Sequence, residues 1–457
     1  MNTPIADFVR RYAASGTARL HMPGHKGRAF LGCEALDITE IAGADSLYEA
    51  HGIIRESEEN ASALFGSART LYSTEGSSQC IRAMLFLCLT CRASGAKPVV
   101  VAARNVHKAF VFAAALLDIE IVWLWPETMT SLCACEVSPV SLDRTLSAMD
   151  APPAAVYITS PDYLGGQADV AALARVCHAH GTVLAVDNAH GAYLRFLSPS
   201  RHPLDLGADI CCDSAHKTLP VLTGGAYLHI AKSAPQAFAL QAKQAMALFG
   251  STSPSYLTLT SLDLCNAYLA DGYAQTLDET VRRVAALRKR LASNGWHALP
   301  SDPLKLTLDA CAAGTTGTAL AQRLRERSVE CEFADPETVV FMLTPETPQA
   351  DMDRLIDALG VCRESARPRP VLPMVKGQRA CSIREAVFAP HETMPARDAL
   401  GRVCGAPTVA CPPAIPIAVS GEVITREALA LLAHYGIDEV DVIKLRLYAR
   451  SKDGVWG

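Results

Sequence analysis

DICCDSAHKTLP, residues 209–220, is the most informative stretch of this 457-residue chain. An apolar strand is predicted to end at Asp213, and the Ser-Ala-His-Lys turn that follows places Lys217 just beyond the strand end. A lysine beside a buried strand is unusual because its charge is costly to remove from water. Desolvation lowers the pKa of an amine and makes it a nucleophile suited to imine formation with an aldehyde. Taken alone, the segment also fits an ordinary surface-loop lysine.

Two other polar residues follow apolar strands. Asp187 ends the strand in TVLAVDNAHG (182–191), with His190 three residues later, and His107 follows PVVVAA (98–103). The carboxyl ends of parallel strands meet at the ligand crevice of an α/β sheet. A carboxylate there can hold a protonated pyridine nitrogen, and a flat imidazole can stack on a ring. A helix-capping aspartate and a loop histidine are the ordinary alternatives.

A possible phosphate site precedes a predicted buried helix. STEGSS (73–78) places Gly76, Ser77 and Ser78 just before the apolar run IRAMLFLCL. Backbone N–H groups and hydroxyls at a helix N-terminus suit a phosphate, although a plain glycine turn with serine caps has the same residues. A phosphate cradle, a stacking ring, a pyridine-nitrogen acid and an imine lysine, in that order, together describe a pyridoxal 5′-phosphate (PLP) site.

The pattern of elements predicts an α/β fold. Strands and helices alternate between about residues 52 and 230, which indicates a mostly parallel sheet with helices on both faces. Helix 169–181 shows the expected signals, because Asp169 can cap its start and Gly181 can end it. The seven predicted strands are 68–73, 99–104, 119–125, 155–160, 182–187, 208–213 and 225–230.

The rest of the chain divides into further regions. A long helix is predicted over 261–295 as a connection between two domains, and strand–helix alternation over 303–360 predicts a second, smaller α/β domain. The Pro- and Arg-rich stretch 364–373 is predicted to be a linker. The expected organisation is an N-terminal arm at 1–50, a large PLP-binding domain at 51–265, a small α/β domain at 266–363 and a C-terminal domain at 374–457.

Composition excludes several classes of protein. The net charge of −5, from 42 basic and 47 acidic residues, gives no electrostatic footprint for nucleic acid or an anionic membrane. The apolar stretch 109–126 is interrupted by Asp118 and Glu120, and the N-terminus has no apolar signal core, so a cytoplasmic location is expected. Neither Cys133 and Cys135 nor Cys211 and Cys212 has zinc spacing with a second half-site, so the 16 cysteines are expected to be free thiols and no metal site is expected.

With these motifs the chain resembles the Orn/Lys/Arg decarboxylase group of fold-type-I PLP enzymes, in the short form that lacks an N-terminal regulatory wing. The resemblance covers nearly the whole chain and implies an aspartate aminotransferase-like large domain with a mostly parallel seven-stranded sheet, a smaller α/β domain and a C-terminal decarboxylase-type domain. The matching stretches are HMPGHKGR (21–28), DITEIAGADSLY (37–48), GSS (76–78), RNVHK (104–108), SPDYLGG (160–166), VDNAHG (186–191), SAHK (214–217), STSPSYLTLTSLD (251–263) and PPAIPIAVSGE (412–422).

The resemblance also implies roles for individual residues. Lys217 would form the internal aldimine, Asp187 would pair with the pyridine nitrogen, and His107 would stack on the ring. The segment from Ser251 to Ser255 would come from a neighbouring subunit, which makes a homodimer or a higher homo-oligomer the expected active unit. The other residues expected at the cofactor are Gly76, Ser77, Ser78, His190, Ser214, His216, Ser251, Thr252 and Ser253, with His216 also counted as catalytic.

The implied activity is decarboxylation of arginine, lysine or ornithine to the corresponding amine and CO₂, as in polyamine formation. Glu49 is a candidate acidic partner for the distal cation of such a substrate. A PLP-dependent aminotransferase or other lyase on the same fold is the alternative, and a non-enzymatic ligand sensor is a third hypothesis. Departures from the group pattern at Asn188, Gly224 and Ala414 concern substrate identity more than cofactor binding.

Overall fold

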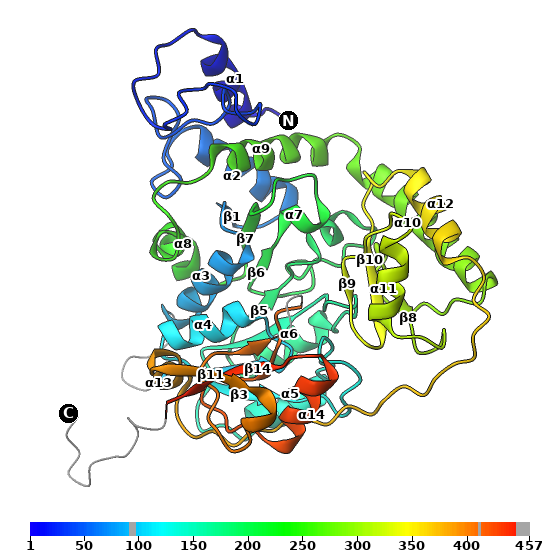
Figure 1. Cartoon of the computed structure of the whole chain (residues 1–457). Coiled ribbons are helices and arrows are strands. Elements are labelled where there is room, and N and C mark those ends of the chain that lie inside the picture. The colour runs from blue at the N-terminus through cyan, green and yellow to red at the C-terminus, as the bar shows by residue number, and fades with distance from the viewer. Residues whose placement is uncertain (91–96, 410–412, 445–457) are drawn as a thin grey trace. The chain divides into compact units, whose positions relative to one another are not determined.

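The computed structural model describes residues 1–90, 97–409 and 413–444 (Figure 1). By its internal contacts the chain divides into two compact units, the first formed by residues 1–96 and 137–367 and the second by residues 97–136 and 368–457. The stretch 97–136, which the sequence assigns to the large domain, therefore groups with the C-terminal region. The boundaries expected from the sequence describe a finer division and stay predictions.

A sheet with the strand order β1-β7-β6-β5-β4 forms the centre of the first unit. β4 (Ala155–Thr159), β5 (Leu184–Asp187) and β6 (Ile210–Asp213) are parallel, whereas β7 (Ala226–Ile230) runs antiparallel to both β6 and β1 (Arg69–Ser73). Nearly every residue of these strands is buried, as expected for a sheet covered on both faces. This α/β architecture confirms the predicted fold class. The antiparallel pairs of the sheet are those that β7 makes with β6 and β1.

Helices surround this sheet (Figure 1). α3 packs against β6, β7 and α8, and α6 begins at the predicted cap, where the Asp169 carboxylate accepts a hydrogen bond from the Ala172 N–H at 2.9 Å. Near the N-terminus α1 and α2 pack against each other and against α9. The bounds are α1 (Pro4–Ala14), α2 (Ile53–Phe65), α3 (Ser77–Thr90), α5 (Pro139–Ser147), α6 (Val170–Ala179), the 3₁₀ turn η1 (Ala192–Phe196), α7 (Ala215–Thr218) and α8 (Gln236–Leu248).

The single long helix predicted over 261–295 is wrong. The structure has two helices instead, α9 (Tyr256–Ala270) and α10 (Tyr273–Ser293). They are separated at Gly272, whose φ of +73° lies in the left-handed region that glycine adopts without steric cost. The apolar periodicity of the sequence continues across Gly272, so the pattern alone does not show that one helix ends and another begins there.

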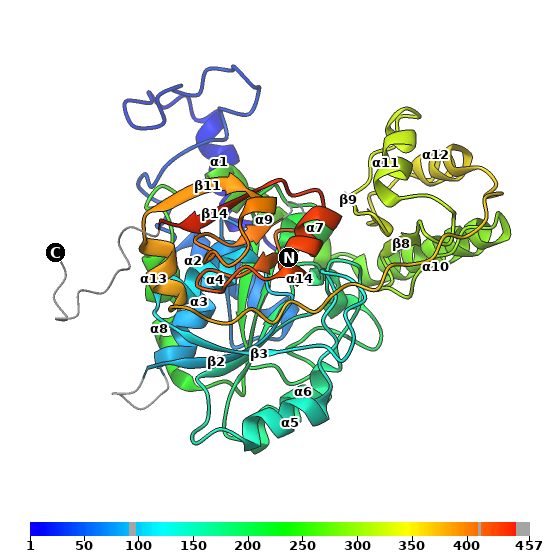
Figure 2. The same ribbon diagram turned by 60° about the horizontal axis from the view of Figure 1, so that its bottom comes forward.

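The predicted small α/β region is present within the first unit. Its sheet has the order β8-β10-β9, with β8 (Lys305–Asp309), β9 (Phe333–Ala334) and β10 (Thr338–Met342), and it carries α11 (Gly317–Arg325) and α12 (Gln349–Leu359). The sequence predicts all of these except β9, which is too short to show a pattern. In both ribbon views β9 is the strand of the small sheet that lies nearest to the large sheet (Figures 1 and 2).

The second unit joins two parts of the chain that are distant in sequence. β2 (Val99–Ala103) and β3 (Glu120–Leu124) pair in parallel around α4 (Lys108–Leu116), and α4 packs against α13 from the C-terminal region (Figure 2). The C-terminal elements are α13 (Ile383–Phe388), β11 (His391–Pro395), the 3₁₀ turn η2 (Ala396–Asp398), β12 (Thr408–Val409), β13 (Pro416–Ala418), α14 (Arg426–His434) and β14 (Glu439–Ile443).

A buried arginine explains why these two parts belong together. The Arg104 guanidinium donates to the carbonyl oxygens of Pro416 and Ile417 at 2.8 and 3.0 Å. It also lies over the rings of Trp123 and Trp125, 5.2 and 5.5 Å from their centroids. Cation–π and hydrogen-bond contacts compensate for burying the charge.

Among the helices of the described ranges, none combines the length and the apolar character needed to cross a bilayer.

Candidate active site

Lys217 lies in the short helix α7, directly after β6. Its Nζ is 3.0 Å from the Nε2 of His190, which itself is buried at 4% exposure. Burial lowers the pKa of Lys217, and the negative charges of Asp187 and Glu332 oppose that shift. The structure thus places the Lys217 amine next to an imidazole, and its role as a nucleophile stays a prediction.

Asp187 is at the carboxyl end of β5 and is 3% exposed. One carboxylate oxygen accepts a hydrogen bond from the Tyr157 hydroxyl at 3.2 Å, and the other accepts one from the Ala189 N–H at 3.2 Å. Burial raises the pKa of Asp187, and the Lys217 amine partly offsets this. Sequence analysis missed Tyr157, because a tyrosine inside an apolar strand carries no signal of its partner.

Ser77 and Ser214, two of the residues expected at the phosphate, contact each other, and Gly76 directly precedes Ser77. The Ser214 hydroxyl donates to the Ser77 hydroxyl at 2.8 Å across the start of α3. Gly76 has φ +73°, and no atom lies within 4 Å of the position that a Cβ would take. The open turn and the helix N-terminus form a cradle of backbone N–H groups that suits an anion. Ser78 lies in the first turn of the same helix.

Gly224, one of the departures from the group pattern, supports this cradle. Its carbonyl accepts a hydrogen bond from the Gly76 N–H at 2.7 Å. Its φ is +94°, and a Cβ at this position would lie 2.8 Å from the Thr74 carbonyl oxygen. A side chain would therefore clash with backbone, so glycine is required here for structural reasons.

His216 has a backbone partner. Its Nδ1 lies 2.9 Å from the Gly225 carbonyl oxygen, and burial lowers its pKa. This contact fixes the orientation of the imidazole and favours the tautomer with hydrogen on Nδ1. Its expected role at the phosphate stays a prediction.

The structure leaves the roles of two other predicted groups untested. His107 belongs to the second unit, where its Nδ1 accepts a hydrogen bond from the Ala109 N–H at 3.1 Å and caps α4. Ser251, Thr252 and Ser253 lie in an exposed turn between α8 and α9, and the Ser251 N–H donates to the Glu75 carboxylate. Ring stacking by His107 and a contribution of Ser251–Ser253 to a neighbouring subunit stay predictions.

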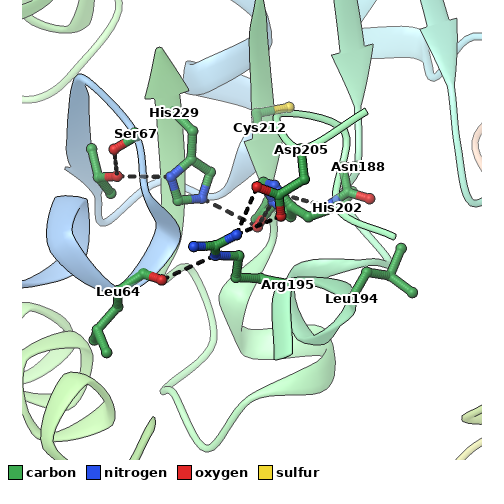
Figure 3. Close-up of polar contacts among 12 residues, drawn as sticks. Leu64, Ser67, Asn188, Leu194, Arg195, His202, Asp205, Cys212 and His229 are labelled. Carbon is green, nitrogen blue, oxygen red and sulfur yellow. Dashed lines mark hydrogen bonds and ion pairs between the residues drawn. The ribbon is translucent and has the colours of Figure 1, made fainter. Parts of the chain in front are cut away.

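A second acidic residue, Asp213, ends β6, and Figure 3 labels three of the side chains that contact it, His202, His229 and Asn188. We define the Asp213 cluster as Asp213, His202, His229 and Asn188. Both imidazole Nε2 atoms are 3.2 Å from one Asp213 oxygen, and the Asn188 amide donates to the other oxygen at 2.7 Å. All four side chains have no exposed surface. Burial alone would raise the pKa of Asp213, but the two imidazoles hold it well below its usual value.

The Asp213 cluster gives a physical reason for the departure at Asn188. A carboxylate at this position would face the ionised Asp213 at hydrogen-bonding distance without water, and like charges in such a place are strongly unfavourable. An amide supplies a donor instead. Sequence analysis missed the two histidines of the cluster because they come from a loop and from β7, and only folding brings them to Asp213.

The chain is similar to several known proteins over most of its length. A family model described as "Orn/Lys/Arg decarboxylase, major domain" matches residues 3–312. A protein named arginine decarboxylase from Bacillus subtilis (strain 168) is 27% identical, covering 94% of this chain and 93% of that protein. Another protein of that name, from Halalkalibacterium halodurans, is 28% identical, with coverages of 94% and 92%. The crystal structure of a Francisella novicida lysine decarboxylase has a TM-score of 0.79 at 18% identity, covering 97% of this chain and 81% of that one, and therefore has the same fold.

Proposed function

The chain belongs to the Orn/Lys/Arg decarboxylase family, and from this premise we propose that it uses PLP to decarboxylate a basic amino acid to an amine and CO₂. The observation that carries the proposal is the contact between the partly buried Lys217 amine and His190 at 3.0 Å, at the end of the strand next to Asp187. Arginine, lysine and ornithine are the substrates that the family name includes.

The residues present fit PLP. Lys217 offers an amine for the aldehyde, Asp187 a buried carboxylate for the pyridine nitrogen, and the turn at Gly76 and Ser77 an open cradle for the phosphate. When bound, PLP supplies an electron sink for the bond that breaks at the substrate's Cα. Ser214, together with Ser77, would hold the phosphate region.

The protein's own groups would control the protons. Burial favours the neutral form of Lys217, and only a neutral amine can act as a nucleophile or take a proton. His190 lies within hydrogen-bonding distance of Nζ, so the two groups can exchange a proton. We therefore assign the return of a proton to the substrate's Cα to Lys217 with His190 as its partner.

Exclusion of water would favour loss of CO₂. Asp187 and His190 are 3% and 4% exposed, so the surroundings of Lys217 are largely desolvated. A substrate carboxylate in such surroundings loses the water that stabilises its charge, whereas neutral CO₂ needs little hydration. The desolvated site therefore favours the reaction that releases CO₂. Asp187 keeps its place because Tyr157 and the Ala189 N–H donate to it.

The proposed active unit is a homodimer. Three residues of one exposed turn are Ser251, Thr252 and Ser253. The resemblance to the decarboxylase group implies that these residues lie at the cofactor. In the proposed dimer, this turn of one copy would lie at the phosphate cradle of the other copy. Sedimentation analysis with and without substitutions at these positions tests the assembly.

The test of the proposed function is a product screen with the purified, PLP-loaded protein. Arginine, lysine and ornithine, with neutral amino acids as controls, are each assayed for released CO₂ and for the amine. We expect stoichiometric CO₂ and amine from at least one basic amino acid. Formation of a keto acid without CO₂ would instead establish an aminotransferase, and no turnover of any basic amino acid would refute the proposal.

A further inference from the structure

Lys305, the first residue of β8, carries a buried amine. Its side chain is 2% exposed, and its Nζ donates to the Asp162 carbonyl oxygen at 2.8 Å. Its ion-pair partner among the described residues is Asp302, whose carboxylate oxygen lies 3.8 Å from Nζ. An ammonium group has three N–H donors, so these contacts satisfy the charge only in part. Burying a charge in this way is costly, which indicates a role beyond packing.

The strand β8 holds the loop that follows β4 through two backbone carbonyls. The Lys305 amine binds the Asp162 carbonyl oxygen, and the Thr307 hydroxyl donates to the Leu164 carbonyl oxygen at 2.7 Å. Lys305 and Thr307 are two residues apart on one strand, so their side chains lie on the same face of it. The two carbonyls flank Tyr163 in the chain. Fixing them sets the direction in which the Tyr163 side chain leaves the backbone.

The Tyr163 ring connects this loop to the reactive amine. The ring lies against the His190 imidazole, with centroids 4.8 Å apart and planes at 67°, and the Lys305 Nζ is 6.0 Å from the ring centroid. The far end of the ring is held by Glu332, whose carboxylate accepts a hydrogen bond from the Tyr163 hydroxyl at 2.7 Å. The His190 Nε2 in turn lies 3.0 Å from the Lys217 Nζ. A series of contacts therefore joins one lysine to the other.

We propose that Lys305 is a positioning residue for the reaction, because it holds Tyr163 against the imidazole of His190. That contact fixes the imidazole beside the Lys217 amine. This inference rests on the proposed function, in which these two groups exchange a proton. A ring packed edge-on leaves the imidazole less freedom to rotate, so its Nε2 stays within hydrogen-bonding distance of Nζ. Lys305 acts through the tyrosine and not by contact with the substrate.

The charge of Lys305 acts in the same direction. Burial and the charge of Lys217 lower the pKa of Lys305. Three carboxylates oppose this shift and favour the charged form of the amine, those of Asp302, Asp162 and Glu332. The repulsion between two ammonium groups is mutual, so a charged Lys305 favours the neutral form of the Lys217 amine. The neutral form is the one that can accept a proton.

The decisive variant is Lys305→Met, which keeps the length of the stem and removes both the charge and the hydrogen bond to the loop. For the basic amino acid that the wild type uses, kcat should fall by about 10-fold while KM changes by less than about 2-fold, because proton transfer is impaired and substrate contacts are not.

Lys243→Met is the matched control. The Lys243 amine also binds a carboxylate, that of Glu58 at 2.7 Å, and a backbone carbonyl oxygen, that of Leu47 at 2.5 Å. It belongs to the contacts of α8 and α2, and no contact links it to the Tyr163 ring among the described residues. This variant should lose stability, because it leaves a buried carboxylate unpaired, but its kcat should stay within about 2-fold of the wild-type value.

A measurement on the cofactor-free protein separates positioning from structural support. Competitive amine labelling, read by mass spectrometry of the peptide that contains Lys217, gives the pH dependence of its reactivity. In Lys305→Met the pKa of Lys217 should be higher, so its labelling at about pH 8 should fall by about 3- to 10-fold. Lys243→Met should match the wild type. An unchanged profile in Lys305→Met would overturn the inference, whereas the expected shift without any decarboxylation would support it and count against the proposed function alone.

A double-variant cycle tests whether Lys305 acts through Tyr163. Tyr163→Ala should lower kcat by about as much as Lys305→Met, and the double variant should lose little more, because both changes release the same imidazole. Tyr163→Phe keeps the ring and should stay closer to the wild type. Losses that multiply in the double variant would overturn the inference. If Lys305→Met does not fold, Thr307→Val takes its place in the cycle, since it removes the other hold on the loop and should give the same non-additive result.

Discussion

Asp187 and Asp213, at the ends of the neighbouring strands β5 and β6, have different surroundings in this molecule. Asp187 pairs in register with Cys212, so Asp213, the next residue on β6, points to the other face of the sheet. On one face Asp187 lies beside the Lys217 amine, and burial raises its pKa. On the other face the two imidazoles of the Asp213 cluster lower the pKa of Asp213.

The difference lies in how completely each carboxylate is satisfied. Asp213 accepts hydrogen bonds from three side chains and is sealed behind Phe65, whose ring centroid is 4.4 Å from that of His229. Asp187 has longer hydrogen bonds, at 3.2 Å each, and lies near the Lys217 amine, whose charge lowers its pKa. A fully satisfied buried charge supports the fold, whereas a partly satisfied one remains available for reaction.

The largest effect on function is expected from Lys217→Ala. Decarboxylase turnover should fall by about 10³-fold or more, because the amine nucleophile is lost. The visible absorbance of bound PLP should disappear as well. The free energy of unfolding, measured in urea, should fall by less than about 1 kcal/mol, because a costly buried amine is removed. Retained turnover would refute the assignment of this residue.

Asn188→Asp is expected to have the largest effect on stability. It places a second carboxylate 2.7 Å from an Asp213 oxygen in a buried site, so the free energy of unfolding should fall by about 3 kcal/mol. The double variant Asn188→Asp/Asp213→Asn restores one carboxylate and one amide. It should be more stable than the sum of the two single changes predicts. Simple additivity of the two losses, measured in urea, would contradict the charge argument.

Tyr157→Phe tests the support of Asp187. It removes one donor to the carboxylate, so kcat/KM for the basic substrate should fall by about 10-fold, in line with a hydrogen bond to a charged group. Tyr227→Phe is the control, since Tyr227 is equally buried but pairs in register with Asp213, on the opposite face. If the two variants lose activity equally, the effect is one of packing and not of Asp187.

The Asp213 cluster predicts a specific response to acid. Because the folded pKa of Asp213 lies below the usual value of about 3.9, its carboxylate stabilises the fold above about pH 4. That contribution is lost as the pH falls through the folded pKa. Between about pH 5 and pH 3 the wild type should therefore lose about 1–2 kcal/mol more unfolding free energy than Asp213→Asn. Parallel losses in the two proteins would show that Asp213 is not ionised.

The smallest effect is expected at Ala414, which belongs to the second unit. This buried alanine has φ +59°, and its carbonyl accepts a hydrogen bond from the Lys108 N–H at 2.8 Å. The related family motif has glycine here. Ala414→Gly should raise the free energy of unfolding by about 0.5–1 kcal/mol, because glycine relieves the left-handed strain of about 1–2 kcal/mol but loses more chain entropy. A destabilised variant in urea would contradict the strained geometry.

Local patterns predicted much of the fold and of the site. The seven strands and the cap at Asp169 were accessible because strand periodicity, turn residues and helix starts are local properties. The break at Gly272 was not, since one glycine does not interrupt an apolar periodicity. Glu49, the acidic candidate from the sequence, accepts a hydrogen bond from Ser46 at 2.7 Å in the N-terminal region, and its role stays a prediction.

The sequence by itself predicted that Lys217 and Asp187 follow the ends of apolar strands, because strand ends depend on residues adjacent in the chain. The tertiary structure alone decided which side chains surround them. His202 and His229 meet at Asp213. Tyr163 contacts both His190 and Glu332, and Glu332 is 169 residues away from it in the chain. Neither grouping is visible in any one segment of the sequence. Long-range contacts set burial, and burial decides which charge is stabilised and which reacts.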